Sequence, residues 1–183
     1  EYLIKLAILQ KKAKNFFVLG ELLGELENQE APKPMTMVWN RTKPHDVTIP
    51  PVESTVWKDP AGNFLVAVVN YSNEPQSFVA AGSQLQIPDK SWKCTRINEY
   101  ENVTVGLTTK PLDIKLTLKP QEIAILTFEE TNLGNRHIVS EMRHQFKAIQ
   151  DTELKDALAE ALLKSENIQK PELTSPCFDL VQG

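Results

Sequence analysis

Acidic side chains are the first candidates for chemistry in this sequence. Hydrolysis of a glycosidic bond requires two carboxylates at a defined separation across the sugar ring. The chain contains 24 aspartates and glutamates, but no pair stands out by its position or its neighbours. Asp46, Glu129 and Glu130 fall at expected strand or loop positions, where solvent accepts a charge. We therefore predict that no residue of this chain is catalytic and that the chain alone is not an enzyme.

The spacing of histidines and cysteines gives one candidate for a metal site. His137, Glu141 and His144 fall at positions i, i+4 and i+7 of an expected helix, so they share a face that could hold a metal ion. The zincin motif needs its histidines at i and i+4, which this spacing lacks. Cys94 and Cys177 belong to no CxxC pair, which argues against zinc and leaves a disulfide or two ordinary thiols open. We predict a solvated polar face with neither metal nor cofactor.

Three tryptophans are the candidates for contact with carbohydrate, because an aromatic ring can stack on the C–H face of a sugar. They are Trp39, Trp57 and Trp92. Tryptophan is also common in sandwich cores and domain interfaces. Since the three residues form no cluster in the sequence, we expect them to be mainly buried and structural, and we keep sugar contact as the alternative.

Charge and hydropathy exclude several classes of partner. The 183 residues carry a net charge of −4, and no basic stripe marks a surface for nucleic acid or anionic lipid. No apolar run approaches the ~20 residues that a membrane-spanning helix needs. N-glycosylation sequons begin at Asn40, Asn70 and Asn102. They favour a secreted or lysosomal protein, and Asn70 is the least accessible of the three because it ends an expected buried strand.

Residues 1–34 are predicted to form a helix and a linker, the end of a domain that is otherwise missing. Prolines are absent from residues 1–31, and apolar residues recur at helical spacing from Glu1 to about Leu26. The apolar sector is widened by Ile4, Ile8, Leu9, Val18 and Leu19. A helix of this kind needs to be covered on more than one side. Gly20 and Gly24 are expected to end or break it.

Residues 35–130 are predicted to form an antiparallel β-sandwich. Short apolar runs are separated by turn signals, which is typical of sandwiches and barrels. The expected strands are 35–39, 53–58, 63–71, 76–80, 83–87, 92–99, 102–107, 111–118 and 122–129. Asp59, Pro60 and Gly62 predict a tight hairpin turn in which the glycine has a positive φ.

Alternation along the strands predicts what covers each face. Apolar and polar residues alternate in 112–119, so one face of that strand should meet solvent. Residues 64–69 and 123–128 are apolar on both faces. One face can enter the sandwich core, and the other has to be covered by a helix or by a missing domain. Residues 131–183 are predicted to be a helical appendage, formed over 136–165 by one long helix or a helical pair, and an irregular tail.

The order of these elements resembles that of a known group of proteins. A helix ending in FFVLGELLG and a Pro-marked linker precede the strand segments VWKDPAGNFLVAVVNYSNEP and LDIKLTLKPQEIAILTFE. This order is similar to the C-terminal region of TIM-barrel glycoside hydrolases and related uncharacterised barrel proteins, in which the last barrel helix leads into a β-sandwich. The residues that match its strand patterns are Trp57, Asp59, Gly62, Asn70, Leu118, Pro120 and Glu122. The resemblance covers residues 1–130 and leaves 133–183 unexplained.

The resemblance implies a function by position. In such barrels the catalytic carboxylates lie at the C-terminal ends of the barrel strands. Those strands would precede Glu1, so no catalytic residue is carried over onto this chain. The implied role is a non-catalytic accessory domain that packs on the upstream TIM-barrel domain of the same parent chain and stabilises it. The alternatives are a carbohydrate-binding module that uses surface aromatics and a protein-interaction module that docks through its apolar N-terminal helix.

Overall fold

The chain is mainly β, with a short helical segment at its start and a helical pair at its end. The computed structural model describes residues 2–30, 32–40, 42–82, 85, 87–88, 90–149 and 152–167. The helices are α1 (Tyr2–Lys12), α2 (Lys14–Phe17), α3 (Asn135–Ala148) and α4 (Thr152–Asn167). The strands are β1 (Glu21–Gly24), β2 (Met35–Trp39), β3 (His45–Ile49), β4 (Val52–Lys58), β5 (Phe64–Asn70), β6 (Gln76–Ala80), β7 (Trp92–Ile97), β8 (Asn102–Thr108), β9 (Ile114–Leu118) and β10 (Ile123–Glu130).

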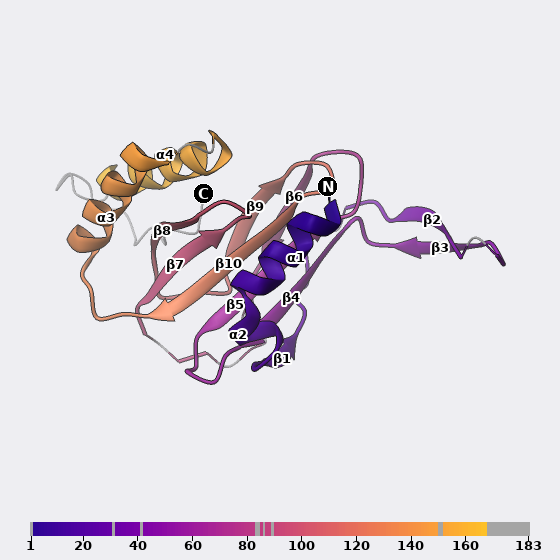
Figure 1. Cartoon of the computed structure of the whole chain (residues 1–183), viewed down its shortest axis with the longest axis horizontal. Helices are drawn as coiled ribbons and strands as arrows, with labels where there is room; N and C mark the ends of the chain where they lie inside the picture. Colours follow the sequence, from indigo (N-terminus) through magenta and orange to yellow (C-terminus); the bar gives the residue numbers. More distant parts are fainter. Residues whose placement is uncertain are drawn as a thin grey trace.

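The described strands form three sheets, and every pairing between them is antiparallel. The largest has six strands in the order β1-β4-β5-β10-β7-β8, and the smaller ones are β2-β3 and β6-β9. The predictions of mainly β structure and antiparallel pairing are therefore confirmed. In Figure 1 the helical pair lies beside β8 at one end of the large sheet, and the β2-β3 hairpin projects from the opposite end of the molecule.

The hairpin turn predicted between β4 and β5 is confirmed. Gly62 has φ 90°, a conformation that residues with a Cβ rarely adopt. Its N–H donates to the Asp59 carbonyl over 3.0 Å. The Asp59 side chain accepts from the N–H of Asn63 at 2.8 Å and from its amide at 3.0 Å. This turn fixes the register in which Lys58 pairs with Phe64.

The central strands β5 and β10 are buried on both faces, as their composition predicted. On one face, Phe64, Val66 and Val68 share a core with residues of β6 and β9. On the other face, Leu65 and Ala67 belong to a second core, which is completed by α1 and α2. The second face of these strands is therefore covered by the N-terminal segment of the chain itself.

The prediction of one helix from Glu1 to about Leu26 is wrong. The first helix ends at Lys12, a short turn of helix follows over Lys14–Phe17, and residues 21–24 form strand β1. A Cβ on Gly20 would collide with the carbonyl oxygens of Phe16 and Lys58. The backbone at Gly20 therefore lies directly against β4, and the chain continues along that strand. If the helix continued past Gly20, the backbone groups along this edge of β4 would have no strand to pair with. Strand β1 satisfies them, so tertiary structure overrides the helical pattern.

The C-terminal segment is a helical pair, one of the two forms that the sequence left open. Helix α3 ends at Ala148, and the next residue, Ile149, has an extended conformation with φ −66° and ψ 128°. Ile138, Met142 and Leu158 join Val103 of β8 in a third core. The irregular tail predicted after Lys170 lies outside the described residues.

Strands β1 and β3 were not predicted from the sequence. Strand β1 was hidden in the helical pattern, and β3 follows the Pro-containing turn after β2. The strand predicted at 83–87 falls mostly outside the described residues. Along β9 the exposed residues Lys115 and Thr117 alternate with Ile114 and Leu118, which are buried. The prediction of one solvated face for this strand is confirmed.

Candidate docking surface and polar sites

The N-terminal segment covers the large sheet with its inner face. Leu9, Ala13 and Phe16 are buried against β5, β7 and β10. Phe17 meets Trp57 of β4 edge to face, with ring centroids 5.3 Å apart. The spacing of these residues puts them on one side of the helical segment. The segment is therefore an integral part of the fold and supplies three of the eight buried residues of the second core.

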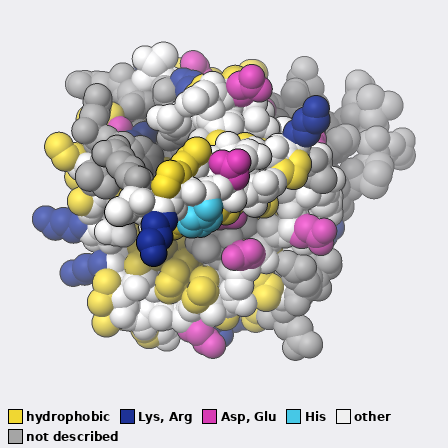
Figure 2. Space-filling view, turned by 90° about the vertical axis from the view of Figure 1, so that its right-hand side faces the viewer, with side chains coloured by type: hydrophobic (Ala, Val, Ile, Leu, Met, Phe, Trp, Pro, Cys, Tyr) yellow, Lys and Arg dark blue, Asp and Glu magenta, His cyan; other side chains and the backbone are white. Residues whose placement is uncertain are grey.

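The outer face of the same segment is also apolar, and it is exposed. The exposed side chains, with their fractional exposures, are Ile4 at 66%, Ile8 at 36%, Val18 at 74%, Leu19 at 65% and Leu22 at 52%. We call this set the outer apolar surface. Its residues lie on α1, on the turn after α2 and on β1. Seen from the hairpin end, hydrophobic side chains gather on the side of the molecule where these elements lie (Figure 2).

Polar contacts fix the helix along one side. The Nζ of Lys12 donates to the carbonyl of Asn98 over 2.8 Å, and Lys5 forms an ion pair with Glu99 at 3.3 Å. Desolvation against the β7–β8 turn lowers the pKa of Lys12, while the carboxylates of Glu99 and Glu101 act in the opposite direction. These contacts set the rotation of α1, so that Ile4 and Ile8 face away from the sheet.

The three tryptophans do not form one binding platform. Trp92 is buried in the core shared with β6 and β9, at 2% exposure. Trp57 is partly buried on the opposite face of the sheet, against Phe17. Trp39 is 61% exposed at the end of β2. The prediction of a mainly buried, structural residue holds for Trp92 and Trp57 and is wrong for Trp39. Among the described strands β2 pairs with β3 alone, and none of its residues is buried.

The three sequons differ sharply in accessibility. Asn40 and Asn102 are exposed, whereas Asn70 is 1% exposed. The Asn70 amide donates to the carbonyls of Glu74 and Lys119, each over 2.8 Å. Its oxygen accepts from the N–H of Ser72 at 2.9 Å and from the hydroxyl at 2.8 Å. Asn70 therefore ties two loops together and has no free atom to which a glycan could be attached.

The candidate acids lie at separate places and face different partners. Asp46 is exposed on β3. Glu130 pairs with Lys90 at 2.7 Å, and Glu129 lies 3.9 Å from Lys93. These contacts are those of solvated surface carboxylates.

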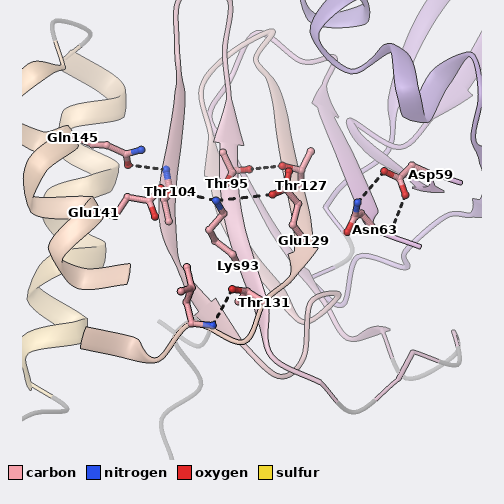
Figure 3. Close-up of polar contacts among 11 residues, drawn as sticks. Asp59, Asn63, Lys93, Thr95, Thr104, Thr127, Glu129, Thr131, Glu141 and Gln145 are labelled. Carbon is pink, nitrogen blue, oxygen red and sulfur yellow. Dashed lines mark hydrogen bonds and ion pairs between the residues drawn. The ribbon is translucent and has the colours of Figure 1, made fainter. Parts of the chain in front are cut away.

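One polar cluster joins α3 to the edge of the sheet (Figure 3). The hydroxyl of Thr104 donates to Glu141 over 2.8 Å, and its backbone N–H donates to the Gln145 side chain over 3.0 Å. Lys93 lies 3.9 Å from Glu141. Strand β8 is the edge of the sheet, so Gln145 satisfies a backbone group that would otherwise be open. The cluster fastens the appendage to β8.

The histidines of the candidate metal face do not converge on Glu141. His137 and His144 are exposed on α3, while Glu141 turns toward Thr104 and Lys93. Among the described residues, no three side chains of His, Cys, Asp or Glu are grouped as metal ligands. In the same part of the chain, no helix is long and apolar enough to cross a membrane.

Glu122, like Asp59, Gly62 and Asn70, is a residue of the strand patterns with a clear structural role. One carboxylate oxygen accepts from Arg96 at 2.6 Å, and the other accepts from the N–H of Lys119 at 2.7 Å. Gln121 between them has φ 57°, so the turn places a non-glycine residue in the left-handed region. Glu122 therefore holds this turn and joins it to β7.

Cys94 is a free thiol in the core, at 5% exposure. Burial raises the pKa of this thiol to about 12, against the smaller, opposite effect of Arg96. Such a thiol is a poor nucleophile, because the thiolate is the reactive form. Cys177 lies outside the described residues.

Comparison with models of known protein families and with curated proteins finds no match for this chain.

Proposed function

We propose that this chain is the non-catalytic accessory β-sandwich of a glycoside-hydrolase-like protein. In this proposal, the sheet β6-β9 and the six-stranded sheet are the two layers of the sandwich. The outer apolar surface docks on a barrel domain that precedes Glu1 in the same polypeptide. The observation that carries the proposal is the exposure of this surface on a segment whose inner face is fully used by the core.

The residues that match the strand patterns of barrel-associated sandwiches support the proposal. Asp59 and Gly62 form the β4–β5 turn, Asn70 joins two loops, and Glu122 holds the turn before β10. These residues have structural roles in the turns and loops of the sandwich, and none of these roles is catalytic. A role in stabilising a neighbouring domain is consistent with such a set.

Burial of the outer apolar surface is worth enough to hold two domains together. Removing ~500 Å² of apolar surface from water contributes about 12 kcal/mol before ordering costs, at roughly 25 cal/mol per Å². The same surface, when left open, promotes association. We therefore expect the excised chain to self-associate, and we expect polar substitution of the surface to reduce this.

Light scattering over a concentration series tests the docking surface. The test variant is Ile4→Lys combined with Leu19→Lys. The matched control is Leu163→Lys on α4, because Leu163 is also exposed, at 64%, but lies away from the surface. The proposal expects a lower mass for the test variant and no change for the control. A wild-type chain that stays monomeric at all concentrations, or a coding sequence with no barrel upstream of Glu1, contradicts it.

The absence of catalysis is tested directly. Steady-state assays of the 183-residue chain on a panel of aryl glycosides should give no turnover above background. Turnover that one acid-to-amide substitution abolishes would place a catalytic residue in this chain and would refute the accessory role.

A carbohydrate-binding module is the second candidate, and the exposure of Trp39 favours it. The ring lies opposite His45 on the neighbouring strand, so a sugar stacked on it would find a polar neighbour. Titration with soluble oligosaccharides, followed by tryptophan fluorescence, tests this candidate. A saturable shift that is lost in Trp39→Ala supports sugar binding, whereas an unchanged spectrum removes it.

A further inference from the structure

The helical pair α3-α4 packs on a single strand of the large sheet. Among the described elements, the two helices pack on each other and on β8, and neither packs extensively on any other helix or strand. In Figure 1 both helices lie at the β8 end of the sheet, away from α1 and from the β2-β3 hairpin. The pair can therefore leave the sheet without disturbing the packing of another described element.

The core between the pair and β8 is small, and it shares no buried residue with the other two cores. Five described residues are buried in it, and Val103 is the one that the sheet supplies. The two cores that hold the strands and the N-terminal segment together contain sixteen and eight buried residues, none of them from α3 or α4. Segments with few buried apolar contacts open at a lower free energy than the rest of a protein. We expect the pair to open before the sheet unfolds.

The connection between β10 and α3 has the properties of a hinge. The backbone N–H of Thr131 donates to the Ser91 carbonyl over 3.0 Å, which fixes the chain just after β10. Residues 132–134 follow, all of them exposed, and α3 begins at Asn135. Hinges are a few residues at the ends of elements that absorb a change in φ and ψ. Rotation within these three residues moves both helices together and leaves β10 in place.

Side chains of α3 hold the closed position through one residue of β8 (Figure 3). Glu141 accepts from the Thr104 hydroxyl over 2.8 Å, and Gln145 accepts from the Thr104 N–H over 3.0 Å. Thr104 is 2% exposed in this closed form. Because β8 is the last strand of the sheet, the N–H that Gln145 occupies lies on its outer edge. When the helices leave, this edge is open to another strand.

Strand β8 lacks the features that usually protect an edge strand. Natural edge strands are shielded by charged side chains, by proline, by a bulge or by a covering element. Four of the seven residues of β8 are β-branched, and none is charged or proline. A register shift opposite Cys94 and Thr95 is its one irregularity. Uncharged segments of high β-propensity are prone to pair with strands of other chains, so the helices are the main protection of this edge.

We propose that the helical pair is a lid over β8 that opens as one unit, and that the edge it uncovers pairs with the β8 edge of a second copy of this chain. Two identical edges can pair antiparallel about a two-fold axis, so that each supplies the strand that the other lacks. Seven residues on each side are enough for a ladder of ordinary length. This inference does not rest on the proposed function, because it uses neither the outer apolar surface nor a second domain.

Hydrogen exchange of the 183-residue chain, followed by mass spectrometry of its peptides, tests whether the lid opens separately. We expect the amides of α3 and α4 to be at least about tenfold less protected than those of β5 and β10. Val66→Ala, at a site of 0% exposure in the core shared with β6 and β9, should speed exchange in β5 and β10 roughly tenfold. It should leave the helices unchanged, because the sheet is intact both with the lid closed and with the lid open. An equal rise in both regions would show that the chain unfolds as one unit and would overturn the lid.

Met142→Ala tests what the open lid exposes. Met142 is 0% exposed in the core with Val103, so the cavity should raise the population of the open form roughly 30-fold. The substitution is made in the chain that carries Ile4→Lys and Leu19→Lys, which weaken association through the outer apolar surface. We expect light scattering to show a concentration-dependent dimer in which β8 is protected from exchange while α3 and α4 are not. Lys147→Ala, at an exposed position of the same helix, is the control and should stay monomeric.

Each other result counts against the inference. A Met142→Ala chain that stays monomeric, although its helices exchange faster, overturns the pairing of the two edges. A dimer in which β8 still exchanges freely overturns it as well, because another surface then holds the two copies. Helices that exchange no faster in Met142→Ala overturn the lid itself. Gln145→Ala removes one bond to Thr104 and leaves the core intact, so it repeats the test without a cavity and without its cost to the stability of the whole chain.

Discussion

Replacement of Asn70 by alanine should be among the most damaging single changes in the sheet. The substitution removes two donated and two accepted hydrogen bonds of a side chain that is 1% exposed. Each such bond contributes about 1 kcal/mol, and a buried group left without a partner costs a further 1–3 kcal/mol, at order-of-magnitude precision. The Ser72 hydroxyl keeps its own bond to the Glu74 carbonyl at 2.9 Å, which offsets part of the loss. We expect a decrease of about 3 kcal/mol in the free energy of unfolding.

Urea denaturation, followed by circular dichroism and by the fluorescence of buried Trp92, measures this change. The matched control is Asn73→Ala, which removes a single bond of an exposed side chain to Gln121 and should cost less than ~0.5 kcal/mol. Asn70→Asp keeps the shape but faces two carbonyl oxygens with a carboxylate. It should be destabilised at neutral pH, and partly recover as the pH falls and the acid regains a donor. A loss below ~1 kcal/mol for Asn70→Ala would refute the view that this side chain holds the two loops together.

A substitution in the β4–β5 turn and a labelling experiment in the core give two further tests. Gly62→Val should lower the free energy of unfolding by more than ~1 kcal/mol, because valine is strained at φ 90°. Gly134→Ala is its control, since Gly134 has φ −74° and open space around it; an equal loss at both sites in chemical denaturation would refute the conformational argument. In a Cys177→Ser background, Cys94 should react with iodoacetamide at pH 8 only after unfolding, because burial raises the pKa of its thiol to about 12. Rapid reaction of the native protein, followed by mass spectrometry, would show that the core around β7 opens.

Strand positions could be predicted from the sequence because local signals and tertiary packing agree there. The turn at Asp59–Gly62 carries its own residues for positive φ, and β5 and β10 are apolar runs that any core would bury. The prediction of a single N-terminal helix failed because the local signal and the tertiary packing disagree there. The pattern continues past Gly20, but the close approach of Gly20 to Lys58 depends on a strand far along the chain. Contacts between distant segments leave no periodicity in the sequence.

The exposed apolar residues and the β2-β3 hairpin were predictable only in part. The wide apolar sector of the first helix predicts a second covering layer, and its outer residues are exposed in the structure. Of the β2-β3 hairpin, only the first strand was predicted, although the signal for the second is present. Met35, Met37 and Trp39 fall at alternate positions with Thr36 and Val38 between them, and Val47 and Ile49 alternate with the polar residues Asp46 and Thr48. The alternation predicts a half-buried ribbon, and in the structure Met35, Met37, Val47 and Ile49 are partly buried.

The two edge strands of the large sheet, β1 and β8, have different neighbours, and this difference decides where a partner can attach. At one end, α3 caps edge strand β8: Gln145 satisfies the Thr104 N–H, and Ile138 and Met142 pack on Val103. At the other end, the edge is β1, a short strand that contributes Leu22 to the outer apolar surface. A capped edge resists pairing with other chains, and an uncapped edge beside apolar residues invites contact. Association of this chain should therefore be polarised, with the N-terminal segment facing the partner and the helical pair facing solvent.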